Sequence, residues 1–293
     1  MIIEPDQVPP ARLQQYLQHA VAPRPVCFAS TINRAGQVNL SPFSFFNLFS
    51  SNPPILVFSP SRRVRDNTTK HTLENVIEVP EVVINIVDYP MLHQMSLASC
   101  EYPREINEFT KAGFTEEKSS MVKPPMVRES KIKLECRVNE VKPLGEGGGA
   151  GNLVIAEVLK MHIDDSVLDQ EGMIDQRKLD LVARLGANWY CRANASNIFE
   201  VEKPNIKLGI GIDAIPASIR NSEILTGNNL GQLGNVHDMP LVNNQYQSDR
   251  LKQIIQYYSI NPQEMEKELH RYAKELLDEG KVDDAWQVLL ANN

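Results

Sequence analysis

The sequence predicts a mainly β domain with flanking helices, followed by a C-terminal helical extension. Six short segments rich in β-branched and apolar residues follow one another between residues 26 and 163, separated by turn-forming residues. After residue 248, apolar residues recur instead at the spacing of amphipathic helices. The composition changes near Pro204, so we expect one domain over residues 1–203 and an extension over residues 204–293, irregular and then helical.

Length and charge exclude several classes of protein. A chain of 293 residues is long enough to bury a sizeable core. Its formal net charge of -7 argues against sequence-independent binding of nucleic acid, which needs a concentrated basic surface. No apolar run approaches the roughly 20 residues that a membrane span requires, and no secretory signal pattern opens the chain. We therefore expect a soluble, cytoplasmic protein with neither a membrane nor a nucleic acid as partner.

Neither the cysteines nor the histidines are spaced as metal ligands. The four cysteines lie far apart, without a C-x-x-C pair, and the six histidines are scattered. We predict no metal site and no disulfide framework, and we expect free, mostly buried thiols. The cysteines are Cys27, Cys100, Cys136 and Cys191.

The chain opens with a predicted helix over residues 11–19, which ends before an arginine between two prolines. Pro23 and Pro25 favour an extended backbone at Arg24, at the start of the first strand. An arginine held there can contact an anion or a carbonyl group, or it can be a solvated loop residue. The predicted strands are residues 26–32, 38–42, 55–59, 82–87, 132–142 and 153–163.

Residues 39–47, N-L-S-P-F-S-F-F-N, place hydroxyl and amide groups beside three phenylalanines and a proline. A central strand normally excludes proline and alternates apolar with polar residues. This composition suits a planar ligand with polar edges. The alternative is an edge strand or a bulge whose aromatic side chains fill the core.

A cationic loop follows the third predicted strand. Residues 59–72 contain three arginines, one lysine and several serine and threonine hydroxyls, and they precede a predicted helix around residues 73–76. Guanidinium, ammonium and hydroxyl groups near a helix N-terminus form a phosphate site. The alternative is a solvated basic loop in which Thr68 or Thr69 caps the helix. Following the 39–47 strand, the loop favours flavin mononucleotide (FMN), with its ring at one end and its phosphate at the other.

The rest of the first domain carries weaker signals. Residues 91–114 predict two helices around Arg104, which can face a ligand or a partner subunit, and the second ends at Gly113. The glycine-rich residues 145–151 lie between two strands and lack the dinucleotide and phosphate-loop patterns, so they predict a hairpin connection. Residues 176–185 predict a short helix. Trp189 and Tyr190 then lead into a last segment that ends near residue 201.

Three helices close the chain. Ser248 can cap the first, over residues 249–258, and Asn261 followed by proline begins the second, which Gly280 ends. The third begins near Asp283. We expect their apolar faces to cover the first domain, with recognition of a partner or a lid over the ligand site as the alternative. The residues of these faces are Met265, Leu269, Tyr272, Ala273, Leu276, Leu277, Ala285, Trp286, Leu289 and Leu290.

Seven motifs, in order over some 180 residues, resemble the flavin reductase-like, FMN-binding split-barrel family. They are A-P-R-P-V at 22–26, N-L-S-P-F-S-F-F-N at 39–47, P-P-I-L-V-F-S at 53–59, K-H-T-L-E-N at 70–75, Y-P-R-E-I-N-E-F at 102–109, K-A-G-F-T at 111–115 and R-L-G-A-N-W-Y at 184–190. The resemblance covers residues 20 to about 200. It implies a six-stranded antiparallel Greek-key barrel with flanking helices, assembled as a homodimer with FMN at the subunit interface.

The resemblance also implies which residues bind FMN. Residues 41–47 would lie along the isoalloxazine ring, and the loop 59–72 would contact the phosphate. Two positions depart from the family pattern: His71 replaces a common aspartate, and Ala187 replaces a glycine. The candidate cofactor-binding residues are Arg24, Ser41, Pro42, Phe43, Ser44, Phe45, Asn47, Ser59, Arg62, Lys70, Thr72, Arg104 and Tyr190.

The activity implied is an NAD(P)H-dependent flavin oxidoreductase. NADH or NADPH would bind transiently and give hydride to the flavin, and the electrons would pass to an acceptor protein or small molecule. Hydride transfer needs no general acid or base, so the sequence does not identify a catalytic residue. The alternative is an FMN-binding electron-transfer or interaction protein without NAD(P)H turnover, a role that the additional C-terminal helices would suit.

Overall fold

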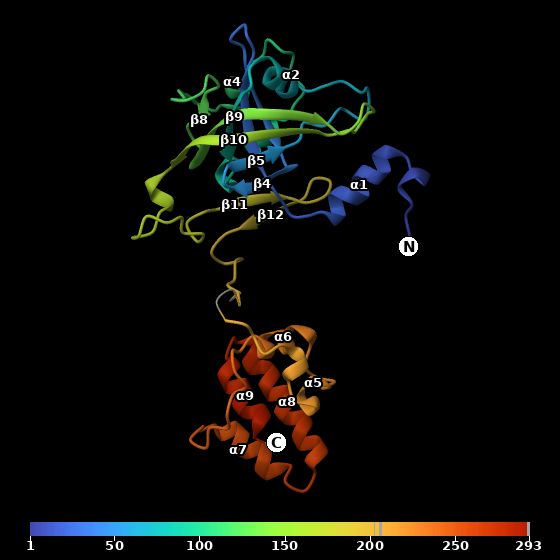
Figure 1. Ribbon diagram of the computed structural model, residues 1–293, viewed down its shortest axis with the longest axis vertical. Helices are drawn as coiled ribbons and strands as arrows, with labels where there is room; N and C mark the ends of the chain where they lie inside the picture. The colour runs from blue at the N-terminus through green and yellow to red at the C-terminus, as the bar shows by residue number, and fades with distance from the viewer. Residues whose placement is uncertain (202, 205–206, 292–293) are drawn as a thin grey trace. The chain divides into compact units, whose positions relative to one another are not determined.

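The chain divides into two compact units. The computed structural model describes residues 1–201, 203–204 and 207–291, and the units are Met1–Phe199 and Glu200–Asn293 (Figure 1). The division predicted from composition lies slightly later, after residue 203. The mainly β domain with flanking helices and the C-terminal helices are both confirmed.

A seven-stranded antiparallel sheet forms the frame of the N-terminal unit. Its strand order is β3-β2-β6-β9-β10-β5-β4. All six predicted strands are present, and the additional strand, β4, lies within and beyond the 39–47 stretch. The strands are β2 (Cys27–Ile32), β3 (Val38–Phe43), β4 (Phe46–Ser51), β5 (Pro54–Phe58), β6 (Glu81–Ile86), β9 (Ile132–Pro143) and β10 (Asn152–Ile163).

Side chains of this sheet enter two apolar cores. On β2, Cys27 and Ala29 join one core with Phe58 and Val154, whereas Phe28 joins the other with Phe109. Successive side chains of a strand point to opposite faces, so one strand can serve both cores. The long β9–β10 hairpin has two register shifts, at Ile155/Ala156 and Val158/Lys160, and such bulges bend a strand around a core.

Short helices flank the sheet. α2 packs against β2 and β3 and buries Leu73 and Val76, but it begins at His71, so neither Thr68 nor Thr69 caps it. The amide of Phe109 donates to the Asn107 side chain at the start of α4, and Gly113 ends that helix, as predicted, with a left-handed φ of 73°. The helical elements of this unit are η1 (Pro5–Gln7), α1 (Pro10–Ala20), α2 (His71–Glu78), η2 (Tyr89–Met91), α3 (Leu92–Leu97), α4 (Glu108–Ala112) and η3 (Asp165–Val167).

Two smaller sheets complete the unit, and one of them corrects the sequence analysis. The helix predicted over residues 176–185 is wrong, because β11 lies there as the central strand of a three-stranded sheet, between β1 and β12. The hydrogen-bonded pairing of β11 with a strand on each side outweighs the weak helical preference of residues 181–184. The strands are β1 (Arg24–Pro25), β7 (Glu116–Glu117), β8 (Met126–Val127), β11 (Leu181–Arg184) and β12 (Tyr190–Ala193).

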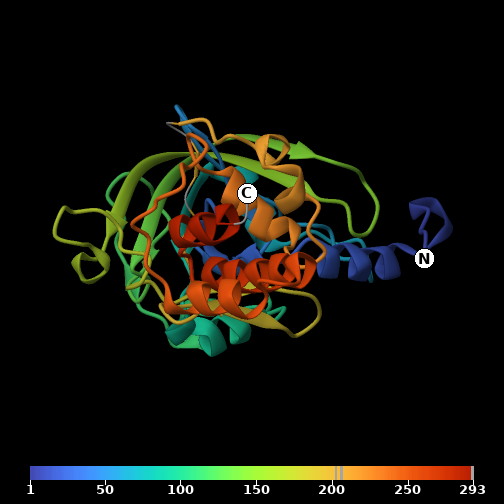
Figure 2. The ribbon, with the colours of Figure 1, turned by 90° about the horizontal axis from the view of Figure 1, so that it is seen from below.

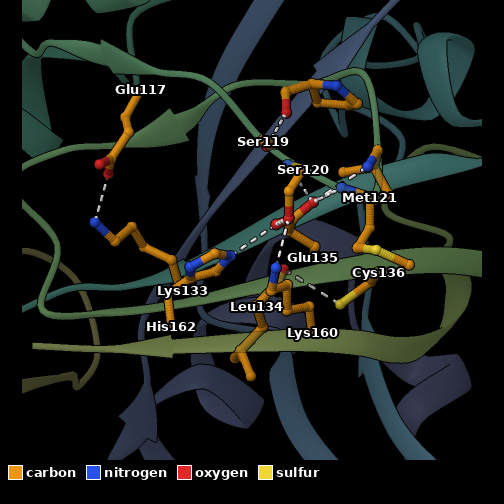
Figure 3. A network of polar contacts seen from close by, with 12 residues as sticks. Glu117, Ser119, Ser120, Met121, Lys133, Leu134, Glu135, Cys136, Lys160 and His162 are labelled. Atoms are coloured by element: carbon orange, nitrogen blue, oxygen red, sulfur yellow. Dashed lines mark hydrogen bonds and ion pairs between the residues drawn. The ribbon is translucent and has the colours of Figure 1, made fainter.

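A buried carboxylate fixes the loop after β7 to β9 and β10 (Figure 3). Glu135 is fully buried and accepts hydrogen bonds from the amides of Ser120 (3.0 Å), Met121 (2.5 Å) and Val122 (3.1 Å). The Ser120 hydroxyl and the His162 ring lie 2.9 and 2.7 Å from its other oxygen. Burial alone would raise the pKa of Glu135, but these hydrogen bonds, led by that of Met121, lower it to about 2.

The C-terminal unit has an apolar core of its own. α8 and α9 pack side by side, and the core also takes residues from the segment for which the sequence predicted no fold (Figures 1 and 2). Asn261 accepts from the Glu264 amide at the predicted start of α8. The helices are η4 (Ile212–Ala214), α5 (Ala217–Arg220), α6 (Gly227–Gly234), α7 (Asp249–Tyr257), α8 (Pro262–Asp278) and α9 (Val282–Leu290).

The apolar helix faces pack against one another, which corrects the expectation that they cover the first domain. Leu269, Leu276, Trp286 and Leu289 are all buried in the core of their own unit, and Met265 packs against that core. Periodicity predicts that a face is buried but not which surface buries it. No helix in the described residues is long and apolar enough to cross a membrane.

Replacing Glu135 by glutamine should destabilise the chain in a pH-dependent way. Because the folded-state pKa is depressed, the carboxylate stabilises the fold above its unfolded pKa, and this contribution disappears as the pH falls toward about 2. We expect Glu135→Gln to lower the free energy of unfolding on the order of 3 kcal/mol at pH 7. Urea titrations should show the difference shrinking below about pH 4.5, the ordinary range of a glutamate. The exposed Glu140→Gln on the same strand is the control, and a pH-independent difference would contradict this account.

Removing the C-terminal unit should leave the N-terminal unit folded. Each apolar core draws its residues from one unit only, so a chain of residues 1–201 loses none of the N-terminal cores. We expect that chain to unfold cooperatively, with a midpoint within about 2 °C of the corresponding transition of the full chain by calorimetry. Aggregation of the shortened chain, or loss of its transition, would show that the extension covers apolar surface after all.

Candidate functional site

Two adjoining hollows lie at the end of β3. One has a volume of about 380 Å³ and extends along the loop after β5 to Lys70, and the other, of about 350 Å³, extends to Arg24 and Tyr190. Both are lined by Gln18, Pro42, Phe43 and Ser44. The residues shared by the two hollows therefore lie on the predicted 39–47 stretch and on α1. We call the two hollows together the cleft.

Lys70 forms no ion pair with a carboxylate of the described residues, although Glu101 lines the same hollows. Its Nζ lies 5.1 Å from the centroid of the Phe43 ring and lines both the larger hollow and a third one of about 70 Å³. Burial, and then the nearby Arg63, lowers the pKa of Lys70, whereas Glu101 opposes that shift. A partly buried ammonium without a counter-ion is stabilised by any anion that enters beside it.

The arginines of the loop are mostly engaged. Glu101 lies 3.0 Å from both Arg63 and Arg65, which neutralises part of the predicted basic loop. Arg62 donates to the side-chain oxygen of Asn67 at 2.6 Å and to its carbonyl at 2.7 Å. These bonds pre-orient the Arg62 guanidinium along the cleft wall while leaving it without an acidic partner among the described residues.

The glycine-rich connection at residues 145–151 forms backbone hydrogen bonds with the loop of residues 59–72, a contact that the sequence did not indicate. The Arg62 amide donates to the Ala150 carbonyl at 2.8 Å, and the Gly149 amide donates to the Arg62 carbonyl at 3.0 Å. A Cβ on Gly148 would lie 2.9 Å from the Val64 carbonyl oxygen. Glycine is therefore required there for the close approach of the two backbones.

Arg24 connects three segments around the cleft. Its guanidinium donates to the carbonyls of Gln18 (2.6 Å) and Val21 (2.5 Å) at the end of α1, and to that of Leu185 (2.9 Å) after β11. It also lies 5.8 Å from the centroid of the Phe45 ring. Its Nε is buried without a partner in the described part of the chain. Burial, and then Arg184, lowers the pKa of Arg24.

The turn between β11 and β12 forms the far wall. A Cβ on Gly186 would meet the His19 ring at 2.2 Å, so this glycine allows α1 to approach the turn. Ala187 adopts a left-handed φ of 49°, where the family pattern has glycine. Arg184 lies 4.5 Å from the centroid of the Tyr190 ring and donates to its hydroxyl.

A buried carboxyl group, that of Glu108, also lines the smallest hollow. Glu108 is buried and accepts from the Leu40 amide at 3.0 Å, but burial outweighs this bond and raises its pKa. The hydroxyl of Thr72 accepts from the Asn39 side chain at 3.0 Å in the same hollow. The neighbourhood of Lys70 thus combines a cation with hydroxyls and a carboxyl group whose pKa is raised.

Most of the predicted site residues line one of these three hollows, and two do not. Arg104 pairs instead with Glu74 of α2, and the exposed Asn47 accepts from the Leu48 amide at 2.8 Å. Sequence reasoning did not select Gln18, Arg184 or Asn188, although the last two belong to a quoted motif. The predicted residues that line the hollows are Arg24, Ser41, Pro42, Phe43, Ser44, Phe45, Ser59, Arg62, Lys70, Thr72 and Tyr190.

Large apolar side chains are exposed beside the cleft. On β4, an outer strand of its sheet, Leu48 and Phe49 are 58% and 68% exposed, and Trp189 of the β11–β12 turn is 71% exposed. α1 has no buried residue at all. Monomeric proteins rarely expose large contiguous apolar patches, so these side chains are the ones that a protein interface on this side of the sheet would cover.

Comparison with known proteins identifies the fold and the family. Residues 19–181 match the flavin reductase like domain. An uncharacterized protein of Halalkalibacterium halodurans is 36% identical over 70% of this chain and 98% of its own length. An uncharacterized protein of Aquifex aeolicus is 37% identical over 59% of this chain and 86% of its own length.

Solved structures agree with this match. Component B of nitrilotriacetate monooxygenase from Bacillus cereus superposes with a TM-score of 0.64 and 28% identity, over 69% of this chain and 98% of its own. A Shewanella frigidimarina protein described as a flavin reductase with a split barrel domain superposes with a TM-score of 0.58 and 24% identity, over 68% and 95% of the two chains. At that identity the second likeness shows the fold, a split barrel.

Proposed function

Since the chain belongs to the flavin reductase-like domain family, we propose that it binds FMN and transfers hydride from NADH or NADPH to the flavin, from which electrons pass to an acceptor. The observation that carries this proposal is the Lys70 ammonium, which lacks a counter-ion among the described residues and lines the cleft beside the aromatic end of β3. The family match supplies the class of cofactor, and the cleft supplies its residues.

The residues of the cleft fit the two ends of FMN. Lys70 and Arg62 would hold the phosphate, with the Ser59 and Thr72 hydroxyls nearby as further hydrogen-bonding groups. The Phe43 ring and the polar groups of residues 41–47 would face the flavin ring. Arg24, which lines the second hollow, places a positive charge beside the proposed ring site. Together these groups match an anionic end and a planar, polar-edged end.

The protein contributes binding and orientation. When bound, FMN supplies the two-electron chemistry. Lys70 neutralises the phosphate, the 41–47 segment orients the ring, and Phe45 with the β11–β12 turn keeps water away from it. We assign no proton transfer to a side chain. The acceptor can be a protein or a small molecule, and the likeness to a monooxygenase component favours a partner enzyme.

We further propose a homodimer whose interface covers the exposed apolar surface of β4, α1 and the β11–β12 turn. A two-fold interface is self-complementary, so each copy would present the same surface to the other. Because this surface borders the cleft, the partner copy would complete the flavin site. The six-stranded Greek-key barrel of the family corresponds, in this proposal, to the seven-stranded sheet without β4.

The second candidate is an FMN-binding electron-transfer or interaction protein without NAD(P)H turnover. The C-terminal unit supports it, because it has an apolar core of its own and none of its described residues lines the cleft or the third hollow. Reaction with reduced nicotinamide separates the two candidates.

Replacing Lys70 and Arg62 together by alanine should weaken FMN binding at least about tenfold. Each removes one charge-assisted contact to the phosphate, worth roughly 1.5–3 kcal/mol when made. Fluorescence titration of the flavin-free apoprotein with FMN measures the change. The control, Lys118→Ala with Lys123→Ala, removes two charges from exposed positions. Equal affinities of the two double variants would reject this phosphate site.

The assembled protein should have about twice the chain mass of 33.0 kDa in light scattering. Placing aspartate at Leu48 and Phe49 should give a monomer with weaker FMN binding, because a charge cannot be buried unpaired in an interface. Met173→Asp, at an equally exposed position outside this surface, is the control. A monomeric wild-type chain that binds one FMN would refute the shared site.

Mixing the FMN-loaded protein anaerobically with NADH or NADPH should bleach the flavin within seconds. The cleft orients the reactants, so the rate should exceed that of free FMN with the same donor by at least about a hundredfold. Stopped-flow absorption at the flavin band measures both rates. Bleaching no faster than that of free FMN would favour the electron-transfer or interaction protein.

A further inference from the structure

A small hollow in the C-terminal unit lies outside the matched family domain. Its volume is about 160 Å³, and it lies between α5, the first half of α8 and the end of α9. Its floor consists of the buried side chains Ile219, Leu269, His270 and Leu289, and Gln263 and Glu266 stand on its rim. The exposed Ser218 and Pro262 complete the lining, so the hollow has an aliphatic floor with one imidazole and a mostly polar mouth.

His270 is buried without a hydrogen-bond partner. Only 6% of the residue is exposed, and no described residue forms a hydrogen bond with its ring. Asn229, another buried polar residue of this unit, is satisfied: it accepts from the Thr226 amide at 3.0 Å and the Thr226 hydroxyl at 2.7 Å, and it donates to Asp278. The buried Nε1 of Trp286 also lacks a partner among the described residues, but Trp286 does not line the hollow. Neither ring nitrogen is among the fully buried polar atoms that lack a partner in the described residues, so both keep accessible surface. His270 lines the hollow, and a molecule that enters it can therefore hydrogen-bond to the ring.

The chemistry of the hollow limits what can enter. Burial lowers the pKa of His270, against the opposing effect of Glu266, so the ring is neutral near pH 7 and offers one donor and one acceptor. The Glu266 carboxylate on the rim repels anions. Two potential ligands one helical turn apart do not make a metal site, and no group of three or more exists in the described residues. The aliphatic floor disfavours an organic cation, which would lose its hydration there, so an uncharged organic molecule remains.

The volume of the hollow narrows the class of possible ligands further. A cavity of roughly 150 Å³ lined by aliphatic side chains holds one benzene ring. The hollow of about 160 Å³ therefore accommodates one six-membered ring with a small substituent. Its three aliphatic floor residues suit the faces of such a ring, and the imidazole suits a single hydroxyl group on it.

We propose that this hollow binds a small, uncharged monocyclic molecule with one hydroxyl group, which hydrogen-bonds to His270 while its ring packs on Ile219, Leu269 and Leu289. The site is separate from the flavin cleft and does not depend on the proposed reductase activity. It gives the C-terminal unit a ligand-binding role of its own.

Phenol and toluene are matched probes, because they differ only in a hydroxyl against a methyl group. The full-length protein, labelled at the Cε1 carbons of its six histidines, is titrated with each probe by NMR, with and without FMN. We expect phenol to shift one histidine resonance in a saturable manner, and toluene to bind about tenfold more weakly. That resonance should be the one absent from the His270→Phe variant.

Variants test the role of His270. His270→Phe should lower phenol affinity about tenfold with little effect on toluene, whereas His237→Phe, at an exposed position of the same unit, should change neither. Gln263→Trp, on the exposed rim, narrows the mouth without touching the core and should also weaken phenol binding. This second variant keeps the test valid should His270→Phe fail to fold.

Three results would overturn the proposal: a silent His270 resonance up to the solubility of phenol, equal binding of phenol and toluene, or unchanged phenol affinity in both variants. Phenol that binds only in the flavin cleft would change the flavin absorption spectrum and leave His270 silent. Failure of FMN to bind would reject the reductase proposal and leave the His270 titration unaffected.

Discussion

The cleft depends on the way one buried guanidinium is satisfied. The Arg24 guanidinium donates hydrogen bonds to the carbonyls of Gln18 and Val21, at the end of α1, and to the carbonyl of Leu185, beyond β11. α1 buries none of its own residues, so little apolar contact within the chain holds it in place. Since a buried charge without partners is costly, the segments that carry these carbonyls are drawn together, and the wall of the cleft follows from that requirement.

The positively charged side chains around the cleft have two different roles. Arg24 is satisfied by backbone carbonyls and Arg63 by Glu101, so both chiefly maintain structure. Lys70 has no such partner among the described residues, and burial lowers its pKa. A positive charge that the fold leaves uncompensated lowers stability until an anion binds. The same distinction separates the buried carboxyl groups: Glu135 receives several hydrogen bonds and is held ionised, whereas burial raises the pKa of Glu108.

Sequence reasoning succeeded where the signal was local or repeated. The six strands, the helix ended by Gly113, the cap at Asn261 and the family follow from periodicity, turn chemistry and ordered motifs. It failed where pairing partners lie far away in sequence. Residues 181–184 form a strand because β1 and β12 lie on either side. The engagement of Arg104 with Glu74, and that of Arg63 and Arg65 with Glu101, likewise required the fold.

The C-terminal helices show the limit of amphipathic patterns most clearly. Leu269 and Trp286 had to be buried, but their spacing is the same whether the burying surface is another domain or a neighbouring helix. The segment around Ile215 and Leu233, which lacks a helical period, supplies that surface within the unit. A unit that satisfies its own apolar faces need not cover the barrel, so its outer surface and its internal hollow are free for roles of their own. His270 then stands out, because its imidazole lies beside aliphatic side chains at the hollow and no described residue hydrogen-bonds to it.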